Sequence, residues 1–431
     1  MPSEYRDVLW DITHGESSDC ASTDVESFTI RSFPDETALF ETGTNGQGAN
    51  GFQITLPLAK LVGTHDSNTR WTQRRVTRDE AVSAGRMLWD ALPAELLHIF
   101  DEPSPAGSLR LKIYSALPRV TDLPWEWLAD KAGQPVALRP DVRLVRCVPL
   151  RFQVSHLTVR MPIKVLIVVT NPKDERLLDP YQEINAVSQQ LQLPGYQMQV
   201  CPEPTLETLQ SMLHDFLPHI VHYIGHAGIN NEEGNLILHN NDNRTYWLPA
   251  SYLSRVLPST VRLLCLSTCF SVPNYQLLGL PHLAHAPSVL SLPTTVANCY
   301  PLGETSVRAF WDAFYASLIT EQGDVNAAAH IARRHAASVE PYFADWASFS
   351  VVLRDRTGKA LHIAQADDPT LESIQASELQ AQYAARLAND LAQQVSVFGD
   401  YASKGVREQF DVETRRASDL LKIAGDMTKD I

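Results

Sequence analysis

Two features that mark other classes of protein are missing from this sequence: long apolar runs and an excess of basic residues. Among its 431 residues, no apolar run reaches the roughly 18 residues of a membrane-spanning helix. The first residues, MPSEYRDVLWDITHGE, are acidic and lack the apolar core of a signal peptide. The formal net charge of −14 opposes non-specific binding to nucleic acid, which needs a basic face. These absences predict a cytoplasmic protein that binds neither a membrane nor nucleic acid directly.

Cysteine is also scarce, and its spacing is irregular. The six cysteines are spread from Cys20 to Cys299 without a Cys-x-x-Cys pair. This spacing is typical of neither a disulfide framework nor a zinc site, so we expect no metal and no cofactor. Because a single cysteine is most often a small buried apolar residue, a reactive one must be identified from its position.

The remaining composition is that of an ordinary globular protein. Apolar residues make up 44% and charged residues 20% of the chain, and its length suggests roughly two or three domains. The sequence pattern changes twice. We therefore expect an N-terminal α+β region at 1–158, an α/β domain at 159–365 and a helical tail at 366–431.

The N-terminal region mixes strand and helix patterns. Its early part, to about Gly51, is polar and contains short alternating pieces that indicate strands and loops. Residues 78–100 favour a helix that breaks near Pro93, because proline disrupts a helix interior. The alternation at 109–117 and 142–150 predicts two half-buried strands.

The middle segment alternates strands with helices. Its first strand, Ile163 to Thr170, is a continuous β-branched run, which is typical of a strand buried on both faces. Such alternation predicts the α/β class, with a mostly parallel sheet flanked by helices. Further strands are expected at 197–201, 219–224, 261–267, 288–292 and 346–353, with a hairpin at 234–239 and 245–248. Helices are expected at 180–193, 205–216, 249–257, 304–320 and 324–337.

Two of these strands lead to a reactive side chain. The strand at 219–224 leads to His226 in the run Gly225-His226-Ala227-Gly228, and the strand at 261–267 leads to Cys269. Neighbouring strands lie about 4.8 Å apart, and the carboxyl ends of parallel strands meet at one edge of a sheet. If these strands are neighbours, an imidazole and a thiol come together as a general base and a nucleophile. A buried thiol and a hydrogen-bonded loop histidine explain the spacing equally well.

A nucleophilic cysteine needs further groups around it. The thiolate is the reactive species, and a free thiol with a pKa of about 8.5 is mostly protonated at neutral pH, so a neighbouring imidazole must take its proton. The backbone N–H groups of Ala227, Gly228 and Cys269 are candidates for an oxyanion hole. Thr268 and Ser271 are small and leave room for a peptide.

Other residues compete for roles at this site. Cys265 and His222 each lie four residues before a candidate reactive residue, inside the two strands. We expect Cys265 to be buried and inert. His222 either lines the floor of a substrate pocket or is a core histidine, which is the commoner role. His282 and His285 lie in a loop rich in Pro and Leu, where no other residue supports a function.

The tail at 366–431 predicts a helical hairpin. Apolar residues recur every three to five positions from Leu371 to Phe398, so one face of a helix is apolar. Gly399-Asp400 interrupts the pattern, and a second helical piece follows to about Ile423. Such a hairpin either packs on the body or presents a detachable face to a regulatory protein.

Four short motifs together resemble those of a known family. They are Leu123-Pro124-Trp125-Glu126-Trp127-Leu128, His222-Tyr223-Ile224-Gly225-His226-Ala227-Gly228, Leu266-Ser267-Thr268-Cys269 and Ala344-Asp345-Trp346-Ala347-Ser348-Phe349. In order and spacing, over about 85–360, they are similar to four features of the CHAT-domain proteins. These features are a Leu-Pro-Trp-Glu box, a His-x-x-Gly-His-Gly box, a Leu-Ser-Ala-Cys box and a closing Trp-x-x-Phe strand. CHAT-domain proteins are caspase-like cysteine peptidases of the clan that contains caspases and separase.

The resemblance implies a caspase-like α/β fold and cleavage of a protein substrate, with His226 and Cys269 as the catalytic residues. It also implies a regulatory partner, acting through 366–431, in a bacterial antiviral-defence or cell-death system. Two positions depart from the family, since Ala227 replaces a glycine and Thr268 replaces an alanine. Both reactive groups remain, so we expect an active enzyme. The alternative is a catalytically weak scaffold or adaptor whose helical tail binds a partner.

The resemblance further implies that the charge of one pocket selects the residue before the cut. Three acidic residues are candidates to receive a basic side chain there, and each also fits a solvated helix surface: Glu304, Asp312 and Asp215. With His222, Thr268 and Ser271, Glu304 completes the predicted substrate pocket.

Overall fold

The structure is a computed structural model, and it describes residues 5–14, 26–33, 51–56, 75–101, 108–115, 117, 120, 123–148, 157–175, 180–192, 195–230, 233–270, 292–354, 358–364, 380, 412, 414–415 and 418–420. Nearly all of the tail at 366–431 falls outside these residues. The helical hairpin expected there, and its partner, therefore stay predictions.

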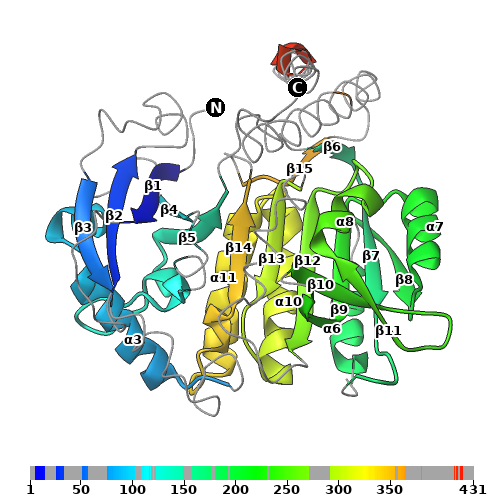
Figure 1. The fold of residues 1–431 in the computed structure, drawn as a ribbon, viewed down its shortest axis with the longest axis horizontal. Helices are drawn as coiled ribbons and strands as arrows, with labels where there is room; N and C mark the ends of the chain where they lie inside the picture. Colours follow the sequence, from blue (N-terminus) through cyan, green and yellow to red (C-terminus); the bar gives the residue numbers. More distant parts are fainter. Residues whose placement is uncertain are drawn as a thin grey trace.

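Most of the described strands join one large sheet (Figure 1). Its strands are β1 (Tyr5–His14), β2 (Glu26–Phe33), β3 (Gly51–Leu56), β4 (Ser108–Ser115), β5 (Val142–Cys147), β7 (Ile163–Val169), β8 (Tyr196–Pro202), β9 (Ile220–Asn230), β10 (Glu233–His239), β11 (Thr245–Pro249), β12 (Leu263–Phe270), β13 (Thr294–Asn298) and β14 (Phe349–Leu353). Across the sheet the order is β11-β10-β9-β12-β13-β14-β5-β4-β1-β2-β3, while β7 pairs with β9 and β8 with β7. A separate parallel pair consists of β6 (Leu157–Arg160) and β15 (Leu361–Ala364).

The sheet contains two parallel blocks that meet at the antiparallel pair β13–β14. One block consists of β8, β7, β9, β12 and β13, and the other of β14, β5, β4 and β1. The pairs β9–β10, β10–β11, β13–β14, β1–β2 and β2–β3 are antiparallel. The expected α/β class with a mostly parallel sheet is confirmed, as is the hairpin of β10 and β11.

Helices cover both faces of the central sheet. They are α3 (Arg78–Ala91), α4 (Ala94–Leu97), α6 (Tyr181–Leu191), α7 (Leu206–Phe216), α8 (Ala250–Val256), α10 (Glu304–Thr320) and α11 (Val325–Val339). Ile220 and Ile224 belong to the core that includes α6, α10 and α11, whereas Val221 and Tyr223 belong to the core that includes α7 and α8. Strand residues that alternate between two apolar cores explain why the β-branched runs are continuous.

Two local expectations have clear outcomes. The helix at 78–100 breaks at Pro93 as predicted, because α3 ends at Ala91 and Pro93 precedes α4. The strand expected at 288–292 lies outside the described residues except for Leu292. The strand that pairs with β12 is instead β13, which begins directly after Pro293.

The N-terminal strands continue the same sheet. Val352 and Leu353 of β14 pair with Arg146 and Cys147 of β5, and β5 pairs in turn with β4. The sequence boundary predicted at 158 stays a prediction, but hydrogen bonds of the sheet cross from one segment to the other.

A buried ion pair strengthens this junction. The Arg146 guanidinium donates to both carboxylate oxygens of Glu126, at 3.0 and 2.6 Å, and the Ser350 hydroxyl donates to the same carboxylate at 2.7 Å. Burial alone would raise the pKa of Glu126, but the charge and hydrogen bonds of Arg146, with Arg333 and Ser350, hold that pKa below its ordinary value of 4.5. The Leu-Pro-Trp-Glu box is therefore a structural anchor between β5 and β14.

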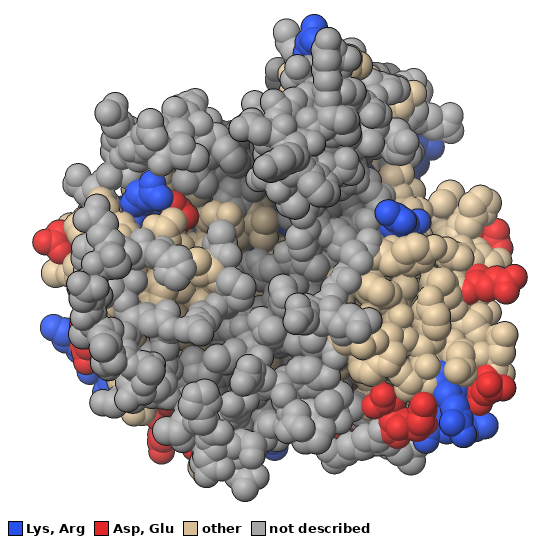
Figure 2. Space-filling view, viewed as in Figure 1, with Lys and Arg blue, Asp and Glu red and all other residues tan. Residues whose placement is uncertain are grey.

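The described surface visible in Figure 2 carries charges of both signs, spread around its rim. None of the described helices is both long enough and apolar enough to cross a bilayer.

Replacing Glu126 by glutamine should lower the free energy of unfolding by about 3–5 kcal/mol at neutral pH, because Arg146 keeps its charge without its partner. Since the folded-state pKa of Glu126 is lowered, its contribution is present above pH 4.5 and is lost as the pH falls through the folded-state value. The difference between wild type and Glu126→Gln should therefore shrink in acid, as urea denaturation between about pH 7 and about pH 3 would measure.

The matched control is Asp141→Asn, which removes a half-exposed ion pair with Arg139. It should cost less than about 1 kcal/mol. A Glu126→Gln effect that is equally small, or that does not change with pH, would contradict the anchoring role.

Candidate active site

The two predicted reactive residues lie side by side on neighbouring strands. β9 and β12 pair in parallel from Ile220↔Leu263 to Ala227↔Phe270, and within this ladder His226 is the direct partner of Cys269. Paired positions belong to the same face of a sheet, and neighbouring strands are about 4.8 Å apart. The strand register therefore brings together two residues that the sequence separates widely. Of Cys269, only the backbone position is described.

The strands extend further than the sequence indicates. Both residues were expected just past the carboxyl ends of their strands, at 224 and 267, and this is wrong. β9 runs on to Asn230 because it pairs with β10 through Ala227↔Leu236, and β12 runs on to Phe270 because it stays paired with β9. The end of each strand depends on its pairing with another strand, and the sequence pattern within one strand does not contain that information.

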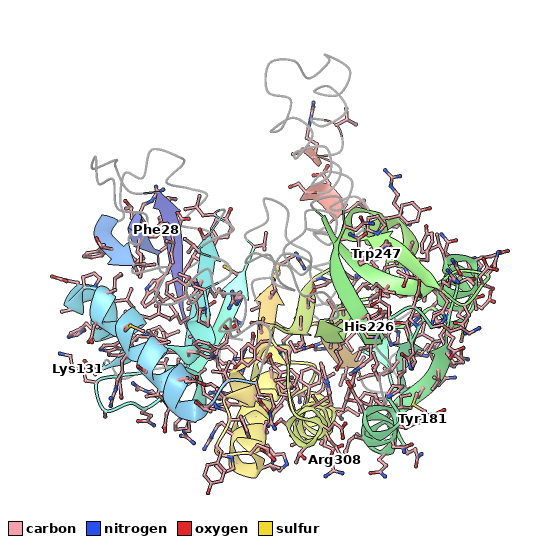
Figure 3. All side chains as sticks on the ribbon, turned by 60° about the horizontal axis from the view of Figure 1, so that its bottom comes forward. Phe28, Lys131, Tyr181, His226, Trp247 and Arg308 are labelled. Atoms are coloured by element: carbon pink, nitrogen blue, oxygen red, sulfur yellow. The ribbon has the colours of Figure 1, made fainter. Side chains whose placement is uncertain are left out.

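The flanking strands end before the reactive pair. The ladder of β7 with β9 ends at Val169↔Ile224, and the ladder of β13 with β12 ends at Leu266↔Ala297. His226 and Cys269 thus lie two and three residues beyond the ends of these ladders, at the edge where functional groups collect in parallel sheets. In the view of Figure 3, His226 lies between the strand of Trp247 and the helix of Tyr181.

The backbone of His226 is held by a buried tyrosine. The Tyr223 hydroxyl lies 2.6 Å from the His226 carbonyl oxygen and 2.7 Å from that of Ile237, and it accepts from the Ile237 N–H. The Thr170 hydroxyl is 2.8 Å away on another side. Burial raises the pKa of Tyr223, so this hydroxyl remains a donor at all physiological pH values. The cluster fixes the strand segment that carries His226.

Only a glycine fits at position 225 beside this cluster of hydroxyl groups, because there is no room for a side chain. A Cβ atom at this position would lie 2.0 Å from the Thr170 hydroxyl oxygen and 2.8 Å from the Tyr223 hydroxyl oxygen. The structure thus shows Gly225 as an extended strand residue beside two packed hydroxyl groups.

The sequence matches the model of a known protein family. A family model described as CHAT domain matches residues 82–355, more than half of the chain. The chain belongs to the CHAT-domain family. Comparison with solved structures finds that of the Saccharomyces cerevisiae separase–securin complex, with a TM-score of 0.39, 10% identity, and coverage of 81% of this chain and 30% of that chain. Comparison with curated protein sequences gives no significant match.

The first histidine of the CHAT His-x-x-Gly-His box is a core residue. His222 is fully buried, its Nδ1 lies 2.8 Å from the Tyr315 hydroxyl, and its Nε2 lies 3.4 Å from a Glu183 carboxylate oxygen. Its ring also contacts Trp311 edge-on. Of the two roles considered for His222, the structure favours the core histidine over the pocket residue, because side chains of helices α6 and α10 contact both of its nitrogens.

The neighbouring thiol is inert as expected. Cys265 pairs with His222 in the ladder and is fully buried, and burial raises the pKa of its thiol. The Tyr315 hydroxyl donates to its sulfur at 3.7 Å. A thiol held protonated in the core cannot act as a nucleophile, which leaves Cys269 as the candidate of this strand.

The two departures from the CHAT motifs lie on the other face of the sheet. Ala227 is buried in the core that includes α7 and α8, and Thr268 alternates with Cys269 along β12. Thr268 is 4% exposed, so it does not form the wall of an open pocket. Neither substitution occupies the face on which His226 and Cys269 pair.

The remaining pocket candidates are scattered. Ser271 lies outside the described residues, as do His282 and His285. Glu304 is exposed in the first turn of α10, which follows β13 and so begins near the same sheet edge as Cys269. Asp215 is exposed on α7, and burial raises the pKa of Asp312 on α10. Among the residues that the structure describes, no cluster of His, Cys, Asp or Glu is placed to hold a metal ion.

One residue beside the site was missed by the sequence analysis. Asn298, at the end of β13, accepts from the Thr268 N–H at 2.9 Å and donates to the Thr268 carbonyl at 2.8 Å. The strand here was expected at 288–292, so Asn298 fell in a predicted loop. Its amide holds the residue directly before Cys269.

Replacing Gly225 by alanine should destabilise the fold by about 1–3 kcal/mol, because the added methyl group overlaps two packed hydroxyl groups. Combination with Thr170→Ala should recover part of this loss, because it removes the closer oxygen atom. Chemical denaturation of the two single variants and the double variant would measure the coupling.

Gly51→Ala serves as the control, since an added Cβ there meets only a side-chain methyl group at 3.2 Å. Purely additive effects of Gly225→Ala and Thr170→Ala would show that the steric account of Gly225 is wrong.

Proposed function

We propose that this CHAT-domain protein is a cysteine endopeptidase in which Cys269 is the nucleophile and His226 the general base. The observation that carries the proposal is the strand register, which makes the two residues direct partners on one face of the sheet. Membership of the CHAT-domain family supports the same assignment.

The reaction needs a proton carrier and a site for negative charge. His226 takes the thiol proton, the Cys269 thiolate forms a bond to the scissile carbonyl carbon, and the carbonyl oxygen becomes an oxyanion. Backbone N–H groups of Ala227, Gly228 and Cys269 are the proposed donors to that oxygen, which requires the ends of the ladders that pair these residues to open around the substrate. The imidazolium then gives its proton to the leaving amine. Water, deprotonated by His226, releases the acid product and restores the thiol.

The proposal extends to the substrate of this enzyme and to its regulation. We propose a protein substrate and a regulatory protein that acts through 366–431, in a bacterial defence or cell-death system. The support is the amphipathic pattern of that tail and the resemblance of the motifs. A detachable apolar helix face is a common way to recruit a partner.

The Cys269→Ala variant should lose cleavage entirely while its unfolding midpoint stays close to that of the wild type. His226→Ala should lower kcat by about 100-fold or more, since it removes the general base. Cleavage-site profiling with a peptide library, with and without proteins encoded nearby, would measure both. Cys265→Ala is the matched control on the same strand and should retain cleavage.

Unchanged cleavage by Cys269→Ala would refute the proposed nucleophile. The rival function is a scaffold or adaptor that has lost turnover, favoured by the replacement of the motif glycine by Ala227. Site-resolved alkylation with iodoacetamide separates the two. Fast, His226-dependent labelling of Cys269 supports the peptidase, whereas labelling no faster than that of a free thiol supports the scaffold.

A further inference from the structure

The ladder between β12 and β13 ends just before the nucleophile. Its last pair is Leu266↔Ala297, so two further steps would place Thr268 opposite Cys299. In a continued parallel ladder the Tyr300 N–H would donate to the Thr268 carbonyl. It donates instead to the Ser348 hydroxyl at 3.0 Å, so the backbone of β13 does not serve that carbonyl.

The side chain of Asn298 makes the two hydrogen bonds to Thr268 that a neighbouring strand would otherwise make. Its amide oxygen accepts from the Thr268 N–H and its amide nitrogen donates to the Thr268 carbonyl, at 2.9 and 2.8 Å. Both residues are 4% exposed, so water does not compete for these bonds. Asparagine supplies a donor and an acceptor at this reach; aspartate lacks the donor, and glutamine is one methylene longer.

Holding Thr268 also orients the reactive residue. The Thr268 carbonyl and the Cys269 N–H belong to one planar trans peptide group, in which they point in opposite directions. Because the carbonyl is fixed toward Asn298, the Cys269 N–H is fixed toward β9, the strand that carries His226. Cys269 is thereby held in the ladder with β9, opposite His226.

We propose that Asn298 is a positioning residue of the catalytic centre, which sets the plane of the Thr268–Cys269 peptide group and so holds Cys269 opposite His226. The inference rests on the proposed function, since it assigns Asn298 a role in the chemistry of Cys269. A purely structural role would only satisfy two buried polar groups of Thr268. The two roles differ in what they do to turnover.

The test compares Asn298→Asp and Asn298→Ala with Ser348→Ala in the full chain. Ser348 is a matched control, because its buried hydroxyl also bonds backbone groups near the site, those of Cys299 and Tyr300, but none of β12. All variants should lose some stability in denaturation, because each removes buried hydrogen bonds. kcat and KM are measured with a peptide that the wild type cleaves.

For Asn298→Asp and Asn298→Ala we expect kcat to fall roughly 100-fold with KM little changed, as for a misplaced nucleophile. An aldehyde of the same peptide, which forms a hemithioacetal with Cys269, should bind at least about tenfold more weakly. Ser348→Ala should keep kcat and aldehyde binding near the wild-type values.

The aspartate variant adds a reversible readout. Protonation of the introduced carboxyl group restores a donor to the Thr268 carbonyl, so the ratio of its kcat to that of the wild type should rise as the pH falls. Asn298→Ala should show no such recovery. Wild-type kcat in both Asn298 variants, or a loss of kcat no larger than that of Ser348→Ala, would overturn the proposal.

The experiments distinguish a failure of the proposed function from a failure of the inference about Asn298. If Cys269→Ala still cleaves the peptide, the nucleophile is wrong and the inference about Asn298 falls with it. If cleavage requires Cys269 but does not respond to Asn298, the inference alone is wrong.

Discussion

The parallel register between β9 and β12 is the constraint on which the candidate site depends. A shift of one residue in that ladder would move His226 and Cys269 to opposite faces of the sheet, because side chains alternate along a strand. The register is protected by burial on both faces, where any slip would exchange the contents of two apolar cores. The geometry of the reactive pair is thus a consequence of core packing rather than of contacts within the site itself.

On each of the two strands that carry a reactive residue, a nearby side chain holds the backbone in place through hydrogen bonds. On β9, Tyr223 holds the carbonyl of His226, and Gly225 leaves the space that this hydroxyl cluster needs. On β12, Asn298 holds Thr268. Supports of this kind bond to the backbone rather than to the reactive side chains. Thr268 can replace the smaller residue of the family motif because its side chain lies on the face opposite to that of Cys269.

Much of the central fold could be predicted because its sequence signals are local. The β-branched run at 163–170 indicated a strand with two buried faces, and Pro93 indicated a helix break. The position of β13 could not be predicted, because apolar residues lie on both sides of Pro293 and the pattern fits a strand on either side. That ambiguity concealed Asn298. The fate of His222 depends on Glu183 and Tyr315, which come from helices distant in the chain, so spacing within the strand could not decide it.

The continuity of the sheet across β5 and β14 limits how this chain can be divided. Every residue of β14 is buried, and one of its two edges is covered in part by β5. A fragment that began after 158 would leave this apolar strand with an open edge, a common template for pairing between molecules. It would also leave Ser350 without its carboxylate acceptor. By covering the edge of β14, strand β5 opposes self-association of the chain. A fragment intended to fold on its own should therefore include β5.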